Sequence, residues 1–268
     1  MEIKLGAQEQ MLDGSDLVEK FRFAQAVGID GIELRGLGDG KFVERRDEVL
    51  AARRAGVVIS SVCVIMDHFI GDFDAERRRD AIDNMKILLS VITDAGGVGA
   101  ITPAAFGLFS RRLPPFTPPR SEAEDRKILL EGLFALGEHA AKAGSLVLLE
   151  PINRYEDYMV NTLAQAASLV QELGMPSVVV MGDTFHMSIE EKDVGASLRQ
   201  HRDVVRHIHL GDSNRFEPGA GHYDWEGTIG ALSEIEYSGW MVMECGLSGP
   251  ATEVLPGATQ LLRGLAGQ

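Results

Sequence analysis

The stretch SVVVMGDTFHM, residues 177 to 187, runs from a continuously apolar segment straight into Asp183, with His186 three residues later. Short apolar runs of this kind are typical of strands that are covered on both faces, as in a parallel sheet. In parallel α/β folds, the polar groups of the active site gather at the carboxyl ends of the strands. The stretch therefore predicts a buried parallel strand that ends at a functional site.

The composition of the whole chain fits a globular protein, with 268 residues, 45% hydrophobic and 25% charged. No linker-like segment divides it, so we expect one domain over residues 1–268. We find no secretory signal and no apolar stretch of the roughly 20 residues that cross a bilayer. We therefore expect no membrane partner and a cytoplasmic protein in which Cys63 and Cys245 are free thiols. The net charge of −14 argues against nucleic acid as a partner.

Short β-rich runs alternate with helical patterns along the chain. The expected strands cover residues 2–7, 31–35, 57–64, 98–104, 145–150, 177–183, 204–212 and 239–246. Helix signals lie between them, including Ser121 and Glu124 at capping-box spacing and Gly144 at the end of the same helix. The sequence has neither a GxGxxG turn after its first strand nor a Walker A loop. Eight strand and helix units predict a closed (β/α)₈ TIM barrel rather than an open doubly wound sheet.

Four of the expected strands carry potential metal ligands at or near their ends: Glu150, Asp183, His209 and Glu244. Successive members are about one strand and helix unit apart, which is roughly 30 residues, so neighbouring strands would bring them to one point. Two carboxylates about 4 Å apart repel by roughly 4 kcal/mol at an effective dielectric of about 20. A cation would relieve this repulsion, and this oxygen-rich set suits Mn²⁺, Mg²⁺ or Co²⁺ better than Zn²⁺. Taken singly, each residue could instead cap a helix or pair with an arginine.

Several segments carry a family resemblance: LLEPINRYEDYMVNT, GDTFHMSIEE, HIHLGDSNR with the later PGAGHYDW, and GWMVMECG. They resemble the sugar isomerase and epimerase barrels related to xylose isomerase, and most closely the ketose 3-epimerases typified by tagatose 3-epimerase. The resemblance is close from about residue 145 to 246. It implies a (β/α)₈ barrel with one divalent metal, usually manganese, on the same four residues. It also implies that Glu156, His186 and Arg215 contact the sugar substrate.

This resemblance implies a metal-dependent epimerase that inverts C3 of a ketose through a cis-enediolate. Glu150 and Glu244 would each address one face of C3, so that one removes a proton and the other returns one. Arg215 and His186 would stabilise the oxyanion that develops on O2. Glu156 would orient His186 or bind a terminal hydroxyl. We also expect a homo-oligomer.

The same site would permit other reactions, because a fold does not fix its chemistry. An aldose-ketose isomerase would use the same metal and glutamates at C1 and C2, and a sugar or cyclitol dehydratase would expel a β-hydroxyl after proton abstraction. An apurinic endonuclease shares the barrel, but it needs more histidine ligands and a basic face for DNA. A noncatalytic, metal-stabilised barrel is a further alternative.

Other polar residues have less specific interpretations. His207 shares the inward face with His209 one layer lower, and we expect it to be a hydrogen-bonded histidine behind the metal ligands rather than a ligand itself. His68 and Glu33 are alternative substrate contacts at the ends of their strands. His222 and Trp225 could shape a loop wall, whereas His139 and His201 are expected at the surface. The Pro/Arg-rich loop 109–121, with Arg111, Arg112 and Arg120, could form a lid, bind a phosphate or acid group, or contact another subunit.

Overall fold

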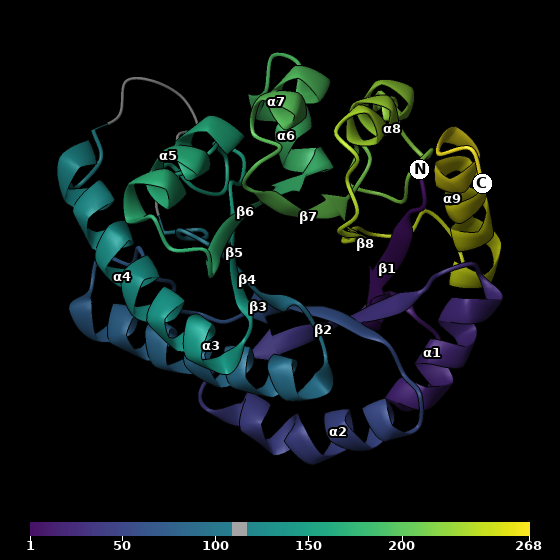
Figure 1. The fold of residues 1–268 in the computed structure, drawn as a ribbon, viewed down its shortest axis with the longest axis horizontal. Helices are drawn as coiled ribbons and strands as arrows, with labels where there is room; N and C mark the ends of the chain where they lie inside the picture. Colours follow the sequence, from purple (N-terminus) through teal and green to yellow (C-terminus); the bar gives the residue numbers. More distant parts are fainter. Residues whose placement is uncertain (109–116) are drawn as a thin grey trace.

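The computed structural model describes residues 1–108 and 117–268 and forms a closed barrel of eight parallel strands (Figure 1). The strands pair in sequence order, and the first strand pairs with the last. Their bounds are β1 Lys4–Gln8, β2 Gly31–Leu37, β3 Ile59–Ile65, β4 Gly99–Pro103, β5 Leu146–Glu150, β6 Val178–Asp183, β7 Val205–Leu210 and β8 Trp240–Met243. All eight strands lie within the ranges expected from the sequence or within two residues of them, which confirms the predicted (β/α)₈ barrel.

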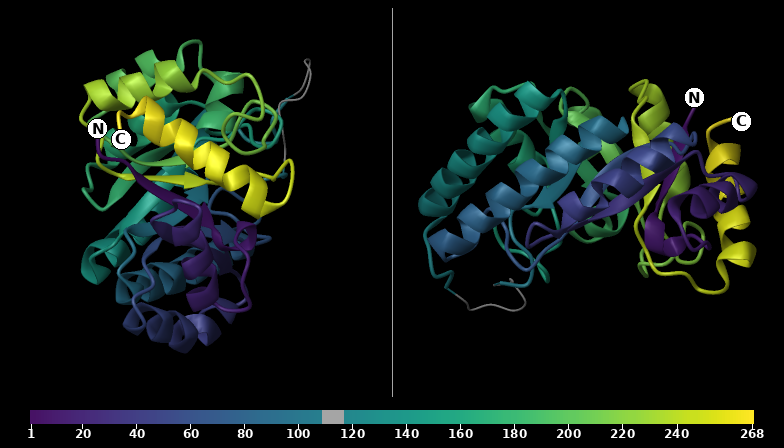
Figure 2. Two further views of the ribbon diagram at one scale, coloured as in Figure 1. Left: turned by 90° about the vertical axis from the view of Figure 1, so that its right-hand side faces the viewer. Right: turned by 90° about the horizontal axis from the view of Figure 1, so that it is seen from below.

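Helices surround the barrel and cover the outer face of the strands (Figures 1 and 2). In the described part of the chain they are α1 Leu17–Ala26, α2 Arg46–Arg54, α3 Ala75–Ala95, α4 Glu122–Ala143, α5 Leu163–Leu173, α6 Thr184–Glu190, α7 Val194–Gln200, α8 Trp225–Glu234 and α9 Ala251–Leu265. Two short 3₁₀ helices, η1 Glu9–Met11 and η2 Lys41–Arg45, follow β1 and β2. No helix among the described residues is long and apolar enough to span a membrane.

The local signals act as the sequence predicts. Ser121 and Glu124 form a capping box at the start of α4, and Gly144 ends that helix in the left-handed conformation. The amino end of Met1 donates a hydrogen bond to the carbonyl of Ala266 at 3.0 Å, so the two ends of the chain lie side by side (Figure 2). Helix α9 thus closes the ring of helices beside β1.

The barrel interior has an apolar layer below a polar one. The apolar layer is a separate buried cluster made of Cys63, Ile101, Leu148, Val179 and Met181. Side chains alternate along a strand, so Glu150, two residues after Leu148, faces the same interior one layer higher. Asp183 and His209 are directly paired across β6 and β7. The register therefore places polar side chains together at the carboxyl ends of the strands, above this apolar layer.

Candidate active site

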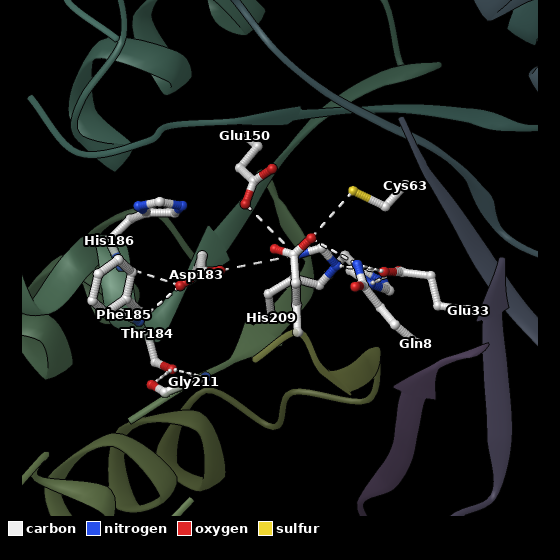
Figure 3. Close-up of polar contacts among 12 residues, drawn as sticks. Gln8, Glu33, Cys63, Glu150, Asp183, Thr184, Phe185, His186, His209 and Gly211 are labelled. Carbon is white, nitrogen blue, oxygen red and sulfur yellow. Dashed lines mark hydrogen bonds and ion pairs between the residues drawn. The ribbon is translucent and has the colours of Figure 1, made fainter. Parts of the chain in front are cut away.

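The four residues that were expected to share a site do lie together. Glu150 ends β5, Asp183 ends β6, His209 lies in β7, and Glu244 directly follows β8. One potential ligand atom from each lies within 4.8 Å of all the others. From Nδ1 of His209, the distances are 3.0 Å to Oε2 of Glu244, 3.6 Å to Oε1 of Glu150 and 4.0 Å to Oδ2 of Asp183. Figure 3 shows Glu150, Asp183 and His209 converging from their strands. We call these four residues the quartet.

Three polar atoms of the quartet are buried without a hydrogen-bond partner. They are Oε1 of Glu150, Oδ2 of Asp183 and Nδ1 of His209. The other carboxylate oxygen of Asp183 accepts hydrogen bonds from the backbone N–H groups of Phe185 at 2.7 Å and His186 at 3.1 Å, which fixes the side chain at the start of α6. Buried polar atoms are costly when unsatisfied. Their convergence means that these residues could hold a divalent cation, and the donor set fits one.

Electrostatics within the quartet favour a positive charge among the three carboxylates. Burial raises the pKa of Glu150, and the negative charge of Glu244 raises it further, although the nearby imidazole of His209 opposes them. Burial also acts on Glu244, but His209 outweighs it and lowers the pKa of that carboxyl to about 2. The surrounding carboxylates hold the pKa of His209 well above its ordinary value against the effect of burial. His209 therefore carries the compensating proton, which a bound cation would displace from Nδ1.

Glu33 holds His209 from the other side of the imidazole ring. Nε2 of His209 lies 2.9 Å from Oε1 and 3.1 Å from Oε2 of Glu33. The same carboxylate accepts hydrogen bonds from Ser61 Oγ at 2.6 Å and Gln8 Nε2 at 3.1 Å, and Nε2 of His207 lies 3.3 Å away. Glu33 is 0% exposed, so it lies behind His209 and not in contact with a substrate. A carboxylate in this position fixes the orientation of a ligating imidazole.

A cavity of about 240 Å³ opens above the quartet. It contains Glu150 and Glu244, and all three predicted substrate contacts, Glu156, His186 and Arg215, line it. Its remaining wall is mostly apolar and is formed by Cys63, Val64, Ile65, Met66, Phe69, Pro103, Phe106 and Ile152. The structure thus brings the catalytic candidates and the predicted substrate contacts into one pocket.

His186 and Arg215 present hydrogen-bond donors to this pocket. Nδ1 of His186 accepts hydrogen bonds from the backbone N–H of Asn153 at 3.2 Å and from its side-chain amide at 2.8 Å. The proton of the neutral ring is therefore assigned to Nε2, which lies 3.8 Å from Glu156. Arg215 donates to Oε1 of Glu156 at 2.7 Å and stacks over the ring of Phe185 at 4.7 Å. Both donors are oriented before any ligand binds.

The loop that carries Arg215 is organised around Asp212. Arg215 has a left-handed backbone conformation, with φ at +60°, which is uncommon for a residue with a side chain. Its N–H donates to the carbonyl of Asp212 at 2.8 Å, while the carboxylate of Asp212 accepts from the backbone of Gly219 and Tyr223 and from Trp225 Nε1. Asp212, Asn153 and Phe185 were not singled out from the sequence, although each lies within one of the segments that carry the family resemblance.

Several of the less specific interpretations are now resolved. Trp225 is 5% exposed and donates to Asp212, so it supports the loop from inside and does not form an exposed wall. His222 is exposed, and His139 is half-buried against Ser90 at 2.8 Å. Both cysteines are free, as expected. His68 lies 2.7 Å from Asp80 in a groove beside the catalytic pocket.

The Pro/Arg-rich loop falls partly outside the described residues, and Arg111 and Arg112 lie in that part. Arg120 is described and lies 2.7 Å from Asp125. It also donates to the backbone carbonyls of Gly71 and Asp72 at 2.5 and 3.0 Å. The guanidinium of Arg120 therefore joins the loop after β3 to the start of α4, and its acid partner in this structure is Asp125.

Comparisons with known proteins agree with this geometry. Residues 21–265 match the family described as xylose isomerase-like TIM barrel. The chain is 38% identical over 244 residues to the 3-dehydro-D-guloside 4-epimerase of Escherichia coli (strain K12), covering 90% of this chain and 92% of that protein. It is also 38% identical over 138 residues to the D-psicose 3-epimerase of Enterocloster bolteae, covering 52% of this chain and 46% of that protein. The solved apo structure of the 3-keto-D-glucoside 4-epimerase from E. coli superimposes with a TM-score of 0.91 at 36% identity, covering 98% of this chain and 100% of that one.

Proposed function

The chain belongs to the xylose isomerase-like TIM barrel family, and on that premise we propose that it is a sugar epimerase that inverts a hydroxyl-bearing carbon next to a ketone. The observation that carries this proposal is the presence of two carboxylates, Glu150 and Glu244, on separate strands in one pocket that also holds oriented hydrogen-bond donors. Inversion needs one group to remove the proton and a second to return one on the other face. The two glutamates supply this pair.

The side chains of the pocket divide the remaining work. Glu150, Asp183, His209 and Glu244 would hold a divalent cation, which would supply positive charge to stabilise the enolate form of the substrate. Nε2–H of His186 and the guanidinium of Arg215 would donate to the oxygen on which negative charge develops, which is typically worth several kcal/mol in acyl transfer and related reactions. Glu156 would hold Arg215 in place, as it does here at 2.7 Å. The apolar wall excludes water from the carbanion-like carbon.

We propose a 3-keto glycoside, inverted at C4, as the first substrate class. Support comes from the 4-epimerase of E. coli, which matches 90% of this chain. Inversion at C3 of a free ketose, which the sequence predicts, is the second candidate and is supported by the partial match to D-psicose 3-epimerase. Both reactions exchange a proton on the carbon beside a ketone, so the same residues serve either one. The aldose-ketose isomerase and dehydratase alternatives are tested in the same experiment.

We propose Mn²⁺ as the cation, because three carboxylates and one imidazole form a mostly oxygen donor set with room for substrate oxygens. Mg²⁺, Co²⁺ and Zn²⁺ are the alternatives, and addition of each to chelator-treated protein would rank them by activity. A cytoplasmic location and a homo-oligomer stay predictions. Nucleic acid is disfavoured as a substrate by the net charge of −14.

The test is an incubation in D₂O of the metal-loaded protein with 3-keto glucosides and, separately, with free ketopentoses and ketohexoses. After removal of the metal, mass spectrometry and proton NMR locate the deuterium. One deuterium at C4 of an epimerised glycoside supports the first candidate, and one at C3 of a ketose supports the second. An aldose product would indicate an isomerase, and a product lighter by one water would indicate a dehydratase. No exchange in any sugar would contradict the proposed function.

A further inference from the structure

We propose that the groove beside the catalytic pocket is a second sugar subsite, which binds the neutral glycosyl or aglycone unit attached to the reacting ring. This inference rests on the proposed function, because it assigns the substrate to the class of glycosides with a sugar-sized second unit. The groove has a volume of about 200 Å³, and its polar side chains come from Asp39, Lys41, Asp67, His68 and Asp80.

The groove and the catalytic pocket are neighbours on the same rim of the barrel. Ile65, the last residue of β3, and Met66, the next residue, line both cavities. A ligand that leaves the pocket above Glu150 and Glu244 on this side therefore passes over Ile65 and Met66 into the groove. The catalytic cavity, at about 240 Å³, is smaller than most cavities that hold small ligands, which start at about 300 Å³. A substrate of two units would need both cavities.

The lining of the groove suits a sugar ring. Leu37 and Ile65 are 36% and 38% exposed and, with Met66, provide an apolar surface for the C–H face of a ring. Carboxylates of Asp39 and Asp67 are acceptors for hydroxyl groups at the rim. Nδ1 of His68 is 2.7 Å from Asp80, which leaves Nε2 of that ring for a ligand. Apolar contact on one side and hydroxyl partners around it distinguish this groove from the largely apolar catalytic wall.

The charges of the groove favour a neutral ligand over a phosphorylated one. Three carboxylates, from Asp39, Asp67 and Asp80, face one lysine, and that lysine, Lys41, already lies 3.7 Å from Asp39. In the described residues around the groove, no cation is left to compensate a phosphate group. A negatively charged second unit would be repelled, whereas hydroxyl groups can donate to the carboxylates.

The backbone around the groove is fixed before any ligand binds. Asn84 of α3 accepts a hydrogen bond from the N–H of Gly40 at 2.8 Å and donates to the backbone and side chain of Asp80 at 3.0 and 3.2 Å. Asn84 is 6% exposed, so these hydrogen bonds are made from the interior of the protein. It ties the turn after β2 to the helix that carries Asp80. A preformed site binds with less loss of entropy than a loop that must order.

The test is the affinity of unreactive probes, measured by calorimetry on the metal-loaded protein. Methyl β-cellobioside is compared with methyl β-D-glucoside and methyl α-maltoside with methyl α-D-glucoside, so that the second ring is the only difference within each pair. The second ring adds one hydrogen bond and its surrounding contacts. We therefore expect at least one disaccharide to bind about fivefold more tightly than the matching one-ring glycoside. His68→Ala should reduce this ratio to near one. His201→Ala, a histidine at the opposite end of the barrel after α7, is the matched control and should keep the ratio.

The subsite would be overturned if the two ligands of each pair bind equally or if neither disaccharide binds. It would also be overturned if His68→Ala leaves the affinity ratio unchanged. His68 is partly exposed and makes one surface pair with Asp80, so its replacement is not expected to unfold the chain. The probes carry no ketone, so their affinities do not depend on turnover. If the deuterium exchange fails but the affinity ratio is as expected, the proposed epimerisation is rejected and the subsite is retained. If exchange occurs but the two ligands of each pair bind equally, the epimerisation is retained and the subsite is rejected.

Discussion

Two buried carboxylates approach His209 from opposite sides of its ring, and their environments differ. Glu33 meets Nε2, is 0% exposed, and accepts further hydrogen bonds from Ser61 and Gln8. Glu150 meets the Nδ1 side, lines the catalytic cavity, and has one oxygen with no hydrogen-bond partner. The first carboxylate has protein partners for its charge, whereas the second is arranged for a partner from outside the chain.

The pKa directions of the two groups express the same difference. Burial acts against the charge of Glu33, but His209 and His207 outweigh it, so the pKa of that carboxyl lies well below its ordinary value. Burial and the charge of Glu244 leave the pKa of Glu150 raised. Burial alone therefore does not distinguish a functional carboxylate from a structural one. The convergence of unsatisfied atoms does: the unpartnered oxygen of Glu150 lies beside unpartnered atoms of Asp183 and His209, within reach of a single ion.

The largest expected effect is the loss of turnover in Glu150→Gln and in Glu244→Gln. Each change removes one of the two groups that exchange the proton, so we expect kcat to fall by a factor of about 10³ or more. The melting temperature of the metal-free protein should stay the same or rise in Glu150→Gln, because the raised pKa of Glu150 means that the fold disfavours its charge. It should fall in Glu244→Gln, because that change removes the ion pair with His209. Steady-state kinetics and calorimetry check both parts. Glu226→Gln, an exposed position in α8, is the control, and full activity in either active-site variant would rule out the two-glutamate mechanism.

Glu33→Gln should lower the stability of the fold and, because Glu33 orients His209, should also weaken metal binding. Breaking a buried ion pair costs about 3–5 kcal/mol, and loss of the carboxylate behind a ligating histidine weakens metal binding by roughly 10–100-fold. Thermal unfolding and metal titration measure the two effects separately. Glu9→Gln is a matched control, because Glu9 is also buried and paired, with Arg45 at 2.7 Å, but outside the quartet. Equal metal affinities in the two variants would show that Glu33 does not act through His209.

His186→Ala should weaken turnover without abolishing it. It removes one donor to the developing oxyanion while Arg215 remains, so we expect kcat/KM to fall by about tenfold, less than the roughly 10²–10³-fold loss seen when an oxyanion donor has no substitute. The Michaelis constant should change less than kcat, because this hydrogen bond strengthens as charge develops. A loss as large as that of the glutamate variants would instead make His186 an acid or base in the reaction.

The smallest effect concerns Asp157, a buried carboxylate that belongs neither to the quartet nor to the group around Glu33. Burial raises its pKa to about 7, despite hydrogen bonds from the backbone of residues 158–160. A raised pKa means that its contribution to stability is full below the unfolded value near 3.8 and is lost as the pH rises through about 7. The melting temperature of Asp157→Asn should therefore rise relative to that of the natural chain as the pH increases from 5 to 8. Each kcal/mol of stability difference corresponds to roughly 2–4 °C in melting temperature. A constant difference across that range would contradict the assignment.

The sequence predicts the strands and the quartet well because both depend on local pattern. Apolar runs locate the strands, and a carboxylate or imidazole at the end of each run lies at the carboxyl rim of a parallel barrel whatever the loops do. Glu150, Asp183, His209 and Glu244 could therefore be found without coordinates. The capping box of α4 is equally local, since Ser121 and Glu124 are three residues apart.

Contacts between distant segments could not be found in this way. Glu33 and His209 are 176 residues apart in the chain, and only the closure of the barrel places Glu33 behind the imidazole rather than in the pocket. Asn153 fixes the proton of His186 through a loop conformation that has no periodic signal. Arg120 is attractive as a phosphate ligand in sequence, but its guanidinium is used by Asp125 and two backbone carbonyls. Side-chain partners, unlike strand ends, depend on the tertiary fold.

The most direct test of this contrast is to locate a bound cation by anomalous X-ray diffraction from crystals grown with Mn²⁺. Glu33, His207 and His209 also lie close enough together to hold an ion, so the experiment discriminates between two real alternatives. We predict one anomalous peak among Glu150, Asp183, His209 and Glu244, on the Nδ1 side of the shared histidine. A peak between Glu33 and His207, or none at either cluster, would contradict the assignment of the quartet as the centre of the reaction.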